Sequence, residues 1–397
     1  MLSLDQVFDA QTVLKNIVRE TKLVRAYGIV PDCELYLKPE NLQITGSFKV
    51  RGSAYKIAML SEEEKAKGVI ACSAGNHAQG VALAATKSGI KSLICLPDSA
   101  PISKVEATKA FGAEVCLVEG CYDDAYQKAL ELKEQEGYTF VHPFDDENVI
   151  AGQGTIALEI LNDLDNVDAI VVPIGGGGLI SGIAYTAKQI RPSIKIYGVQ
   201  VAGAPSMYNS IQHDCIECLP SVSTIADGIA VKQPGDNTFA LVKEYVDEIA
   251  LVTDDEVSSA ILALIEKQKM IAEGAGATAL AAIMARKFDL KGKRVVAVVS
   301  GGNIDVTSLS RVIDRGLLNS GRSSSLLIEL IDKPGQLKEI SRIIADCGGN
   351  VTGVHYEKGN TESVNGCFLR IEMETRDFNH VNLITKAIQD EGFKIVK

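Results

Sequence analysis

Short apolar runs rich in β-branched residues alternate with helix-like stretches over most of the chain. The runs predict strands at residues 92–97, 114–118, 169–174, 196–201 and 294–300. The stretches between them predict helices at residues 76–88, 123–136, 179–189 and 255–268. Strands that are apolar throughout and separated by helices are typical of a parallel sheet covered on both faces. We therefore expect a doubly wound α/β body, which binds ligands at the carboxyl ends of its strands.

The pattern changes near residue 320, where the polar segment 319–324 has no apolar period and predicts a linker. Beyond it, strands are expected at residues 326–331, 350–355, 367–372 and 393–396. Helices are expected at residues 336–346 and 380–389. The resulting order, βαββαβ, is that of a ferredoxin-like domain. We therefore expect a body of residues 1–320 and a separate domain of residues 323–397.

Net charge and composition limit what the chain can bind and where it can reside. The 397-residue chain has a net charge of −11, which disfavours nucleic acid and anionic membrane surfaces. No run of about 18 apolar residues marks a membrane span, and the N-terminus has no signal-peptide pattern. The nine scattered cysteines fit reduced thiols in the cytoplasm. Cys215 and Cys218 have Cys-x-x-Cys spacing, but without a second pair we expect no metal site.

A lysine in the segment 45–52 is the first candidate for chemistry. Lys49 follows Phe48 and is otherwise flanked by small residues. Most lysines are exposed surface groups, and that is the plain alternative here. A lysine removed from water loses part of its basicity, becomes nucleophilic and can form a Schiff base with a carbonyl compound. The segment therefore offers Lys49 as a candidate nucleophile.

The segment 73–80 follows an apolar run and opens into a predicted helix. Small residues at such a junction leave backbone N–H groups free for an anion. The side chains of Ser73, Asn76 and Gln79 can add hydrogen bonds to a carboxylate or a phenolic oxygen. The alternative is an ordinary helix N-terminus capped by Ser73 or Asn76, with no ligand.

Four consecutive glycines, Gly175 to Gly178, lie between a predicted strand and the helix that begins near Leu179. So flexible a turn is explained if the backbone must wrap a phosphate with its N–H groups. No Gly-Lys-Ser/Thr follows, and Ile180 and Ser181 occupy the third-glycine positions of Gly-x-Gly-x-x-Gly. A single phosphate is therefore favoured over a nucleotide, and a nicotinamide-dependent dehydrogenase is disfavoured.

The segment 300–303, Ser-Gly-Gly-Asn, ends the last predicted strand of the body. The hydroxyl of Ser300 can hydrogen-bond a heterocyclic nitrogen without charging it, and a helix cap is the alternative. Taken together, the four segments resemble the fold-type-II pyridoxal-phosphate enzymes and, within them, the threonine dehydratases (threonine ammonia-lyases). The resemblance covers roughly residues 5–320 and is most specific over residues 38–52.

That resemblance implies a fold, a cofactor and a set of site residues. The fold would consist of two doubly wound α/β domains like those of the tryptophan synthase β-subunit, the smaller one (about residues 50–145) inserted in the larger. Lys49 would hold pyridoxal phosphate covalently and act with Ser73 in catalysis. The cofactor would contact Phe48, Lys49, Asn76, Gly175, Gly176, Gly177, Gly178, Leu179 and Ser300. The substrate carboxylate would lie against Ser73, Ala74, Gly75 and His77.

The resemblance also implies a reaction. A carboxylate beside the pyridine nitrogen suits transamination, whereas the neutral Ser300 suits prompt loss of a β-hydroxyl group. The implied enzyme is a carbon–nitrogen lyase that converts threonine to 2-oxobutanoate and ammonia, and also serine to pyruvate. Serine racemases and serine dehydratases of the same family are the alternatives. The racemases use a serine at the position of Ala74 as a second acid–base group, so this alanine favours the dehydratase.

Three further positions bear on cations and substrate. Some relatives hold a divalent cation with an acidic residue just after the strand 196–201, where this chain has Gln200 and then small or apolar residues. We therefore expect no divalent site, while a monovalent cation bound by backbone carbonyls stays open. Glu273 recurs in this family near the cofactor ring, with a structural role as the alternative. Gly228 lies in a loop expected on the substrate side.

Residues from about 323 to the end resemble an ACT domain. Gly335 precedes a predicted helix and Asn350 begins a predicted strand, and both are expected to be regulatory residues. Such domains usually pair and bind an amino acid at the joint; a dimerisation module without ligand is the alternative. Isoleucine or valine would be the effector if the enzyme feeds branched-chain synthesis. The resemblance implies a homodimer or homotetramer. A non-catalytic amino-acid sensor is the alternative from another class, against which the intact Lys49 and Ser300 argue.

Overall fold

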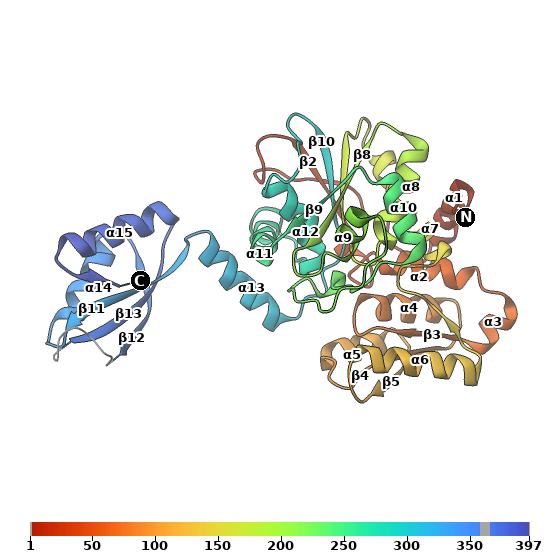
Figure 1. Cartoon of the computed structure of the whole chain (residues 1–397), viewed down its shortest axis with the longest axis horizontal. Coiled ribbons are helices and arrows are strands. Elements are labelled where there is room, and N and C mark those ends of the chain that lie inside the picture. The colour runs from red at the N-terminus through yellow and green to blue at the C-terminus, as the bar shows by residue number, and fades with distance from the viewer. Residues whose placement is uncertain (1, 358–365, 397) are drawn as a thin grey trace. The chain divides into compact units, whose positions relative to one another are not determined.

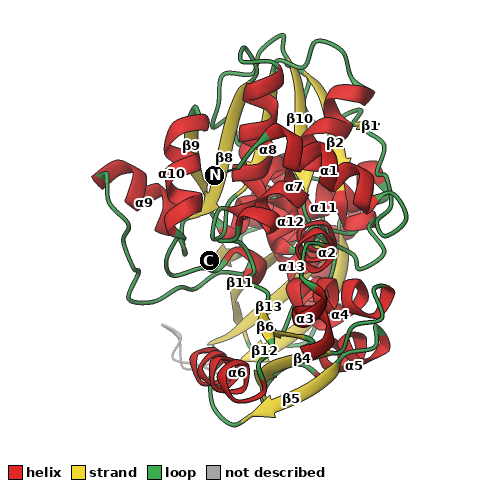
Figure 2. Cartoon of the chain, turned by 90° about the vertical axis from the view of Figure 1, so that its right-hand side faces the viewer, coloured by secondary structure: helices red, strands yellow, loops and turns green. Residues whose placement is uncertain are grey.

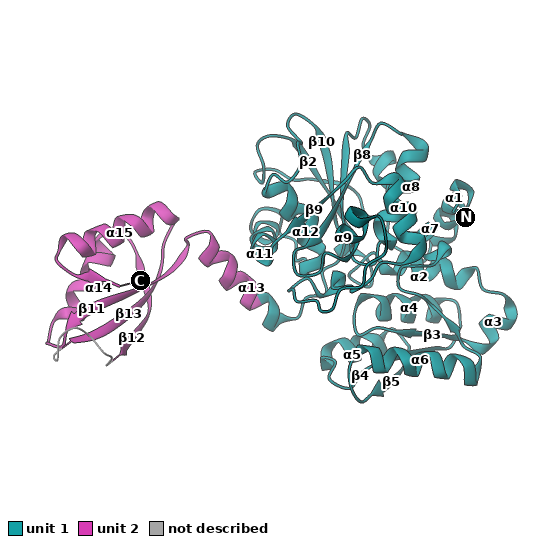
Figure 3. Cartoon of the chain, viewed as in Figure 1, with its two compact units in different colours: residues 1–309 teal, residues 310–397 magenta. Residues whose placement is uncertain are grey.

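The computed structural model describes residues 2–357 and 366–396. The chain divides into two compact units, Met1–Leu309 and Ser310–Lys397 (Figure 3). The first unit contains two mainly parallel sheets and the second a four-stranded antiparallel sheet. The predicted α/β body and the predicted C-terminal ferredoxin-like domain are therefore both confirmed.

Regular structure occupies half of the segment predicted to be a linker. Helix α13 (Val306–Asn319) ends where the predicted linker begins, and strand β11 (Ser323–Ile331) begins before it ends. From Ser323 onward, β11 pairs in register with a neighbouring strand, so ladder hydrogen bonds override the polar composition here. The connection is thus limited to residues 320–322.

The larger sheet of the first unit has six strands in the order β1-β2-β10-β7-β8-β9, all parallel except the short β1. Its central strands β10, β7 and β8 are buried almost throughout, as their continuous apolar runs predict. The strand bounds are β1 (Val24–Arg25), β2 (Glu34–Pro39), β7 (Ala169–Pro173), β8 (Lys195–Val201), β9 (Glu248–Val252) and β10 (Arg294–Val299).

Helices cover both faces of this sheet. Figure 1 shows α7 and α8 on one side and α11 and α12 on the other, and Figure 2 shows the strands flanked by helices. The side chain of Asp146 caps α7 by accepting hydrogen bonds from two backbone N–H groups of its first turn. The helix bounds are α7 (Glu147–Asp163), α8 (Gly178–Ile190), α11 (Asp254–Ala263), the π-helical η3 (Leu264–Gln268) and α12 (Gly274–Met284).

The smaller sheet of the first unit is fully parallel, in the order β5-β4-β3-β6. Helices α4 and α6 lie on opposite sides of it (Figure 1). The carboxyl end of β3 leads directly into α4, as the segment 73–80 predicts. The bounds are β3 (Val69–Cys72), α4 (Asn76–Lys87), β4 (Ser92–Pro97), α5 (Ile102–Ala110), β5 (Glu114–Val118), α6 (Tyr122–Glu136) and β6 (Thr139–Phe140).

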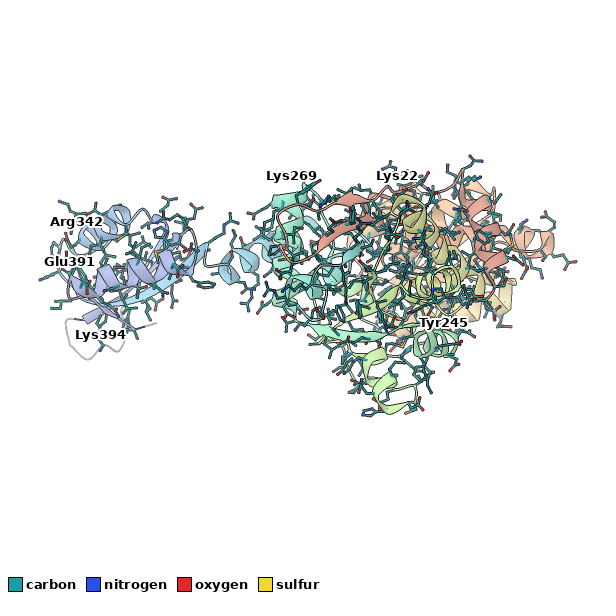
Figure 4. All side chains as sticks on the ribbon, turned by 90° about the horizontal axis from the view of Figure 1, so that it is seen from above. Lys22, Tyr245, Lys269, Arg342, Glu391 and Lys394 are labelled. Carbon is teal, nitrogen blue, oxygen red and sulfur yellow. The ribbon has the colours of Figure 1, made fainter. Side chains whose placement is uncertain are left out.

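The second unit has the strand order β12-β13-β11-β14, with two helices packed on one apolar face of the sheet. Charged side chains line the outer side of these helices; Arg342, labelled in Figure 4, pairs with Glu339 and Asp346 of its own helix. The remaining bounds of this unit are α14 (Gln336–Asp346), β12 (Asn350–Glu357), β13 (Gly366–Glu374), α15 (Phe378–Asp390) and β14 (Lys394–Ile395).

The other elements of the first unit are short or connect the two sheets. Among the described residues, no helix is both long and apolar enough to cross a membrane. The bounds are α1 (Leu4–Leu14), η1 (Glu40–Leu42), α2 (Lys49–Ala58), α3 (Glu62–Lys67), α9 (Ser206–His213), η2 (Asp227–Ile229) and α10 (Asp236–Tyr245).

A buried ionic cluster fixes helix α2. The guanidinium of Arg51 donates to both carboxylate oxygens of Glu40 at 2.8 Å and to those of Glu159 at 2.7 and 2.8 Å. Lys38 also pairs with Glu159. Burial alone would raise the pKa of Glu40, but the charge of Arg51 outweighs it and holds this pKa below its ordinary value. The cluster therefore ties α2 to η1 and α7 through charges that are largely shielded from water.

Replacing Arg51 by alanine should lower the free energy of unfolding by about 3–5 kcal/mol, because two buried carboxylates lose their main partner. Arg286→Ala is the matched control, since Arg286 pairs with Asp32 at 2.8 Å on an exposed surface. Its cost should stay within about 1 kcal/mol. Denaturant unfolding of both variants measures the difference. Equal losses in the two would contradict the assigned role of the cluster.

Candidate active site

The four segments singled out from the sequence meet in one cavity of the first unit. Its volume is about 1010 Å³, and its walls come from the carboxyl ends of strands in both parallel sheets. This is where an α/β sheet is expected to bind its ligand. The predicted cofactor and substrate residues that line the cavity are Phe48, Lys49, Ser73, Ala74, Gly75, Asn76, His77, Gly175, Gly176, Gly177, Gly178, Leu179, Gly228, Glu273 and Ser300.

The amine of Lys49 lies inside this cavity. Lys49 is the first residue of α2, and its Nζ donates a hydrogen bond to the carbonyl oxygen of Pro143 at 2.8 Å. Burial lowers the pKa of Lys49 to about 8, although the carboxylate of Glu273 acts in the opposite direction. The backbone N–H of Phe48 donates to the carbonyl oxygen of Ser300 at 3.1 Å, so the lysine and this serine are held on adjoining backbones. About a tenth of the amine is therefore unprotonated at pH 7, far more than for an ordinary lysine.

Three of the four glycines, Gly176, Gly177 and Gly178, have no space for a side chain. A Cβ atom on Gly176 would lie 2.5 Å from the ring of Phe144, and one on Gly178 would lie 2.8 Å from the Phe144 carbonyl oxygen. Gly177 has a φ of +102°, and a Cβ there would lie 2.7 Å from Thr238. The run ends in the first turn of α8, whose N–H groups have no partner within the helix. It therefore forms a concave surface of N–H donors suited to a phosphate.

Asn76 and Glu273 make a polar pair on the cavity wall. Nδ2 of Asn76 donates to Oε1 of Glu273 at 2.6 Å. The pKa of Glu273 is raised to about 7, first by burial and then by the charge of Asp227. The positive charges of Lys104 and Lys49 act the other way. This carboxyl group therefore changes its protonation state near neutral pH.

The start of helix α4 offers a second set of N–H donors. Ser73 Oγ accepts a hydrogen bond from the N–H of Gly75 at 3.1 Å, which shapes the turn before the helix. Nε2 of His77 lies 2.8 Å from the carbonyl oxygen of Val141 and donates to it, since a carbonyl can only accept. Burial, together with the nearby Lys49, lowers the pKa of His77 to about 3. His77 is thus a neutral group held by the backbone.

Sequence reasoning missed two aromatic residues of the cavity wall. Nδ1 of His142 accepts hydrogen bonds from the N–H groups of Asp145, at 2.7 Å, and Phe144, at 3.3 Å. Burial lowers the pKa of His142, so its ring is neutral. The ring of Phe144 packs edge-on against it, with centroids 4.7 Å apart, and underlies the glycine run. No local motif marks the segment 141–144, so the sequence gives no signal for these roles.

An ion pair between the two subdomains was also not predicted. Nζ of Lys104, on α5, lies 2.8 Å from Oδ2 of Asp227, on η2, and both residues line the cavity. Burial would lower the pKa of Lys104, but Asp227 raises it above its ordinary value. Gly228, predicted on the substrate side, follows this aspartate and donates its N–H to Oδ1 of Asp227 at 2.9 Å. The pKa of Lys104 is therefore shifted in the direction opposite to that of Lys49.

Gln200 stands where some relatives have a divalent-cation ligand, and its side chain is engaged within the fold. Its Oε1 accepts from the N–H of Tyr208 at 2.8 Å, and its Nε2 donates to the carbonyl oxygen of Ile174 at 3.4 Å. Gly335 and Asn350, predicted to be regulatory, belong to the second unit. Gly335 has a φ of +98° at the start of α14, with open space beside it, and Nδ2 of Asn350 donates to Glu374 at 2.9 Å.

These features define a class of protein: an α/β protein with a buried amine and a glycine run suited to a phosphate in the same cavity. Comparison with known families makes the assignment specific. The family model described as "Pyridoxal-phosphate dependent enzyme" matches residues 14–301, and the chain belongs to that family, in its threonine ammonia-lyase group. The resemblance inferred from the sequence is thereby confirmed.

Individual relatives support the same placement. The chain is 48% identical over 398 residues to an L-threonine ammonia-lyase from Thermotoga maritima, covering 100% of this chain and 99% of the relative. Threonine deaminase isoform 2 of Solanum lycopersicum, in its processed form, has a similar structure, with a TM-score of 0.75, 38% identity and coverage of 79% and 94%. Maize serine racemase is also similar, with a TM-score of 0.75, 35% identity and coverage of 80% and 98%.

The cavity fits the cofactor of this family. Pyridoxal phosphate carries a phosphate, an aldehyde, a phenolic oxygen and a ring nitrogen, and each has a counterpart of suitable chemistry on the wall. The glycine run offers N–H donors, and Lys49 offers an amine. Asn76 offers an amide donor and Ser300 a hydroxyl. The clash that any Cβ would cause at Gly176 or Gly178 shows that the cradle has no space for side chains.

The rate at which cofactor-free protein captures pyridoxal phosphate should depend on pH through Lys49. Only the neutral amine attacks an aldehyde, and the pKa of Lys49 is lowered to about 8. The rate should therefore rise about tenfold per pH unit well below pH 8 and level off above it. Stopped-flow absorbance between pH 6 and 10 measures this. A rate that still climbs at pH 10, as for an ordinary lysine, would contradict the lowered pKa.

Proposed function

We propose that this chain is an L-threonine ammonia-lyase that converts L-threonine to 2-oxobutanoate and ammonia, and L-serine to pyruvate. The observation that carries the proposal is the amine of Lys49, whose pKa is lowered to about 8, in a cavity shared with the glycine run and Ser300. Identity of 48% over the full length to an L-threonine ammonia-lyase supports the choice of substrate.

The residues that would hold the cofactor follow from the chemistry of the wall. Backbone N–H groups of Gly175, Gly176, Gly177, Gly178 and Leu179 would bind its phosphate. Phe48 would pack beside its ring, Asn76 would donate to its phenolic oxygen, and Ser300 would face its ring nitrogen. When bound, the cofactor supplies an electron sink for negative charge that develops at the substrate α-carbon. Because Ser300 is a neutral partner, this sink suits elimination better than transamination.

The protein groups would then act on the substrate directly. N–H groups at the start of α4, around Ser73, Ala74 and Gly75, would bind the substrate carboxylate beside His77, because the N-terminus of a helix attracts an anion. The amine of Lys49 would remove the α-proton, and its lowered pKa makes it a competent base near neutral pH. The β-hydroxyl group then takes up a proton and leaves as water, and hydrolysis of the resulting enamine releases ammonia.

Racemisation needs an acid–base group on the face of the substrate opposite Lys49. Ala74 lines the cavity at the position where racemases have a serine, and its methyl group carries no proton to exchange. The hydroxyl of Tyr122, another lining residue, points at the carbonyl oxygen of Cys72, 3.5 Å away, and burial raises the pKa of this tyrosine. These observations favour elimination over racemisation.

We also propose that the second unit binds an amino-acid effector, isoleucine or valine, near Gly335 and Asn350. The open space beside Gly335 and the start of α14 support an anion-accepting position there. Residues 1–320 would form the catalytic part and residues 323–397 the regulatory part. Adding isoleucine to the activity assay tests this proposal.

We further propose that the chain assembles as a homodimer or homotetramer in the cytoplasm. Leu42, at the end of η1, and Ile44, in the loop that follows, are 44% and 43% exposed. Ile271, whose carbonyl oxygen accepts from the neighbouring Asn41, is 52% exposed. An exposed apolar group of this kind favours burial against a second copy. The nine cysteines are all free thiols, as a reducing compartment favours.

The activity is tested by 2-oxo acid release from L-threonine and L-serine, with D-serine measured alongside. L-Threonine should give 2-oxobutanoate, and Lys49→Ala should abolish turnover because both the cofactor attachment and the base are lost. Lys65→Ala, on the exposed helix α3, should retain activity and serves as the control. Racemisation of serine without 2-oxo acid release would exclude the proposed function.

A further inference from the structure

Asn303 follows the segment that carries Ser300 and reaches back to the cofactor side of the cavity. Its Nδ2 lies 2.7 Å from the carbonyl oxygen of Thr45 and 2.7 Å from Oδ1 of Asn76. A longer contact of 3.4 Å joins the same atom to Oε1 of Gln79. One amide group therefore bridges the loop before Lys49 and the start of α4.

The backbone determines which atom of the Asn303 side-chain amide makes these hydrogen bonds. The carbonyl oxygen of Thr45 can only accept, so the atom of Asn303 that faces it must be the amide nitrogen. That nitrogen has a second hydrogen, which it donates to Asn76. The atom of Asn76 on that side must therefore be its oxygen, and its own NH₂ group is turned towards Glu273 and the cavity.

Glu273 cannot set this orientation by itself. Its pKa is raised to about 7 by burial and by Asp227, so near neutral pH it is present both as an acceptor and as a donor. A protonated Glu273 would pair equally well with Asn76 turned the other way. The carbonyl oxygen of Thr45, in contrast, can only accept a hydrogen bond. It fixes the orientation of the Asn303 amide, and that amide in turn fixes the orientation of the Asn76 amide.

The surroundings hold Asn303 in place. Gly46 has a φ of +70°, and a Cβ there would lie 2.2 Å from Oδ1 of Asn303. The N–H of Gly302 donates to the carbonyl oxygen of Gly46 at 2.8 Å, and Ser47 forms a bridge with Gly301. The side chain of Asn303 thus fills space that only a glycine at position 46 leaves open.

We propose that Asn303 is a positioning residue that fixes the Asn76 amide with its NH₂ group turned into the cavity. This face of the site then binds a ligand oxygen that accepts a hydrogen bond, such as a phenolate oxygen of the cofactor. It disfavours a ligand group that must donate a hydrogen bond. The inference rests on the proposed placement of pyridoxal phosphate against Asn76. Asn303 itself takes no part in the chemistry.

Two substitutions distinguish the loss of the Asn303 hydrogen bonds from a reversal of the Asn76 amide. Asn303→Leu removes the donor and should weaken binding of pyridoxal phosphate to the cofactor-free protein roughly five- to tenfold. Asn303→Asp places an acceptor against both the Thr45 carbonyl and Asn76, so Asn76 must turn over. Its loss should exceed that of the leucine variant, and the visible absorbance of the bound cofactor should shift at a fixed pH. Fluorescence titration and absorbance spectra measure both effects.

Asn41→Leu is the matched control. Nδ2 of Asn41 also donates to a backbone carbonyl, that of Ile271 at 2.9 Å, in the same region of the fold. It makes no contact with Asn76 among the hydrogen bonds of the described residues. This variant should lower the melting temperature but leave cofactor affinity and spectrum unchanged. In an Asn76→Ala background, Asn303→Leu should add no further loss of affinity, because it acts through Asn76.

The proposal is overturned if Asn303→Leu behaves like Asn41→Leu, lowering only the melting temperature. It is also overturned if the loss of affinity persists in full in the Asn76→Ala background. Absence of 2-oxo acid release by the wild-type protein would instead refute the proposed function. Because the coupling of Asn303 to Asn76 is measured by cofactor affinity, that failure is distinguishable from failure of this inference.

Discussion

The placement of the reactive lysine depends on a guanidinium that never touches the cavity. Arg51 lies two residues after Lys49 on α2, and its hydrogen bonds to Glu40 and Glu159 fix the first turn of that helix against η1 and α7. A buried cluster of this kind is costly to break because each carboxylate would be left without its partner in a medium of low polarity. The position of the amine is therefore set by the ionic core of the first unit.

The cavity then controls charge by burial. Removal from water lowers the pKa values of Lys49 and His77 and raises that of Glu273, so groups that are charged in water approach neutrality here. Lys104 shows the contrast, since Asp227 keeps it charged at the edge of the same cavity. With neutral histidines and an amine of lowered pKa, the backbone N–H dipoles of the glycine run and of the start of α4 supply positive potential where a phosphate and a carboxylate would bind.

Local sequence signals predicted the parts of the site that depend on local backbone. The four glycines, the small residues before α4 and the serine after β10 are each found at a strand end, as their patterns indicate. Residues that depend on tertiary distances could not be found in this way. No sequence motif marks His142 or Phe144. The orientation of the Asn303 amide becomes clear only from its contact of 2.7 Å with the carbonyl oxygen of Thr45. The start of β11 at Ser323 was similarly hidden, because pairing with β13 decides it and not composition.

The central claim is that Lys49, one of three lysines that line the cavity, carries the cofactor, because burial lowers the pKa of its amine to about 8. Reduction of the cofactor-loaded protein with borohydride, followed by peptide mapping, tests it directly, since reduction makes the lysine–cofactor link permanent. We expect the pyridoxyl group on the peptide that contains Lys49, with Lys104 and Lys232 unmodified. Labelling of Lys104 or Lys232, or of none of the three lysines, would contradict the account.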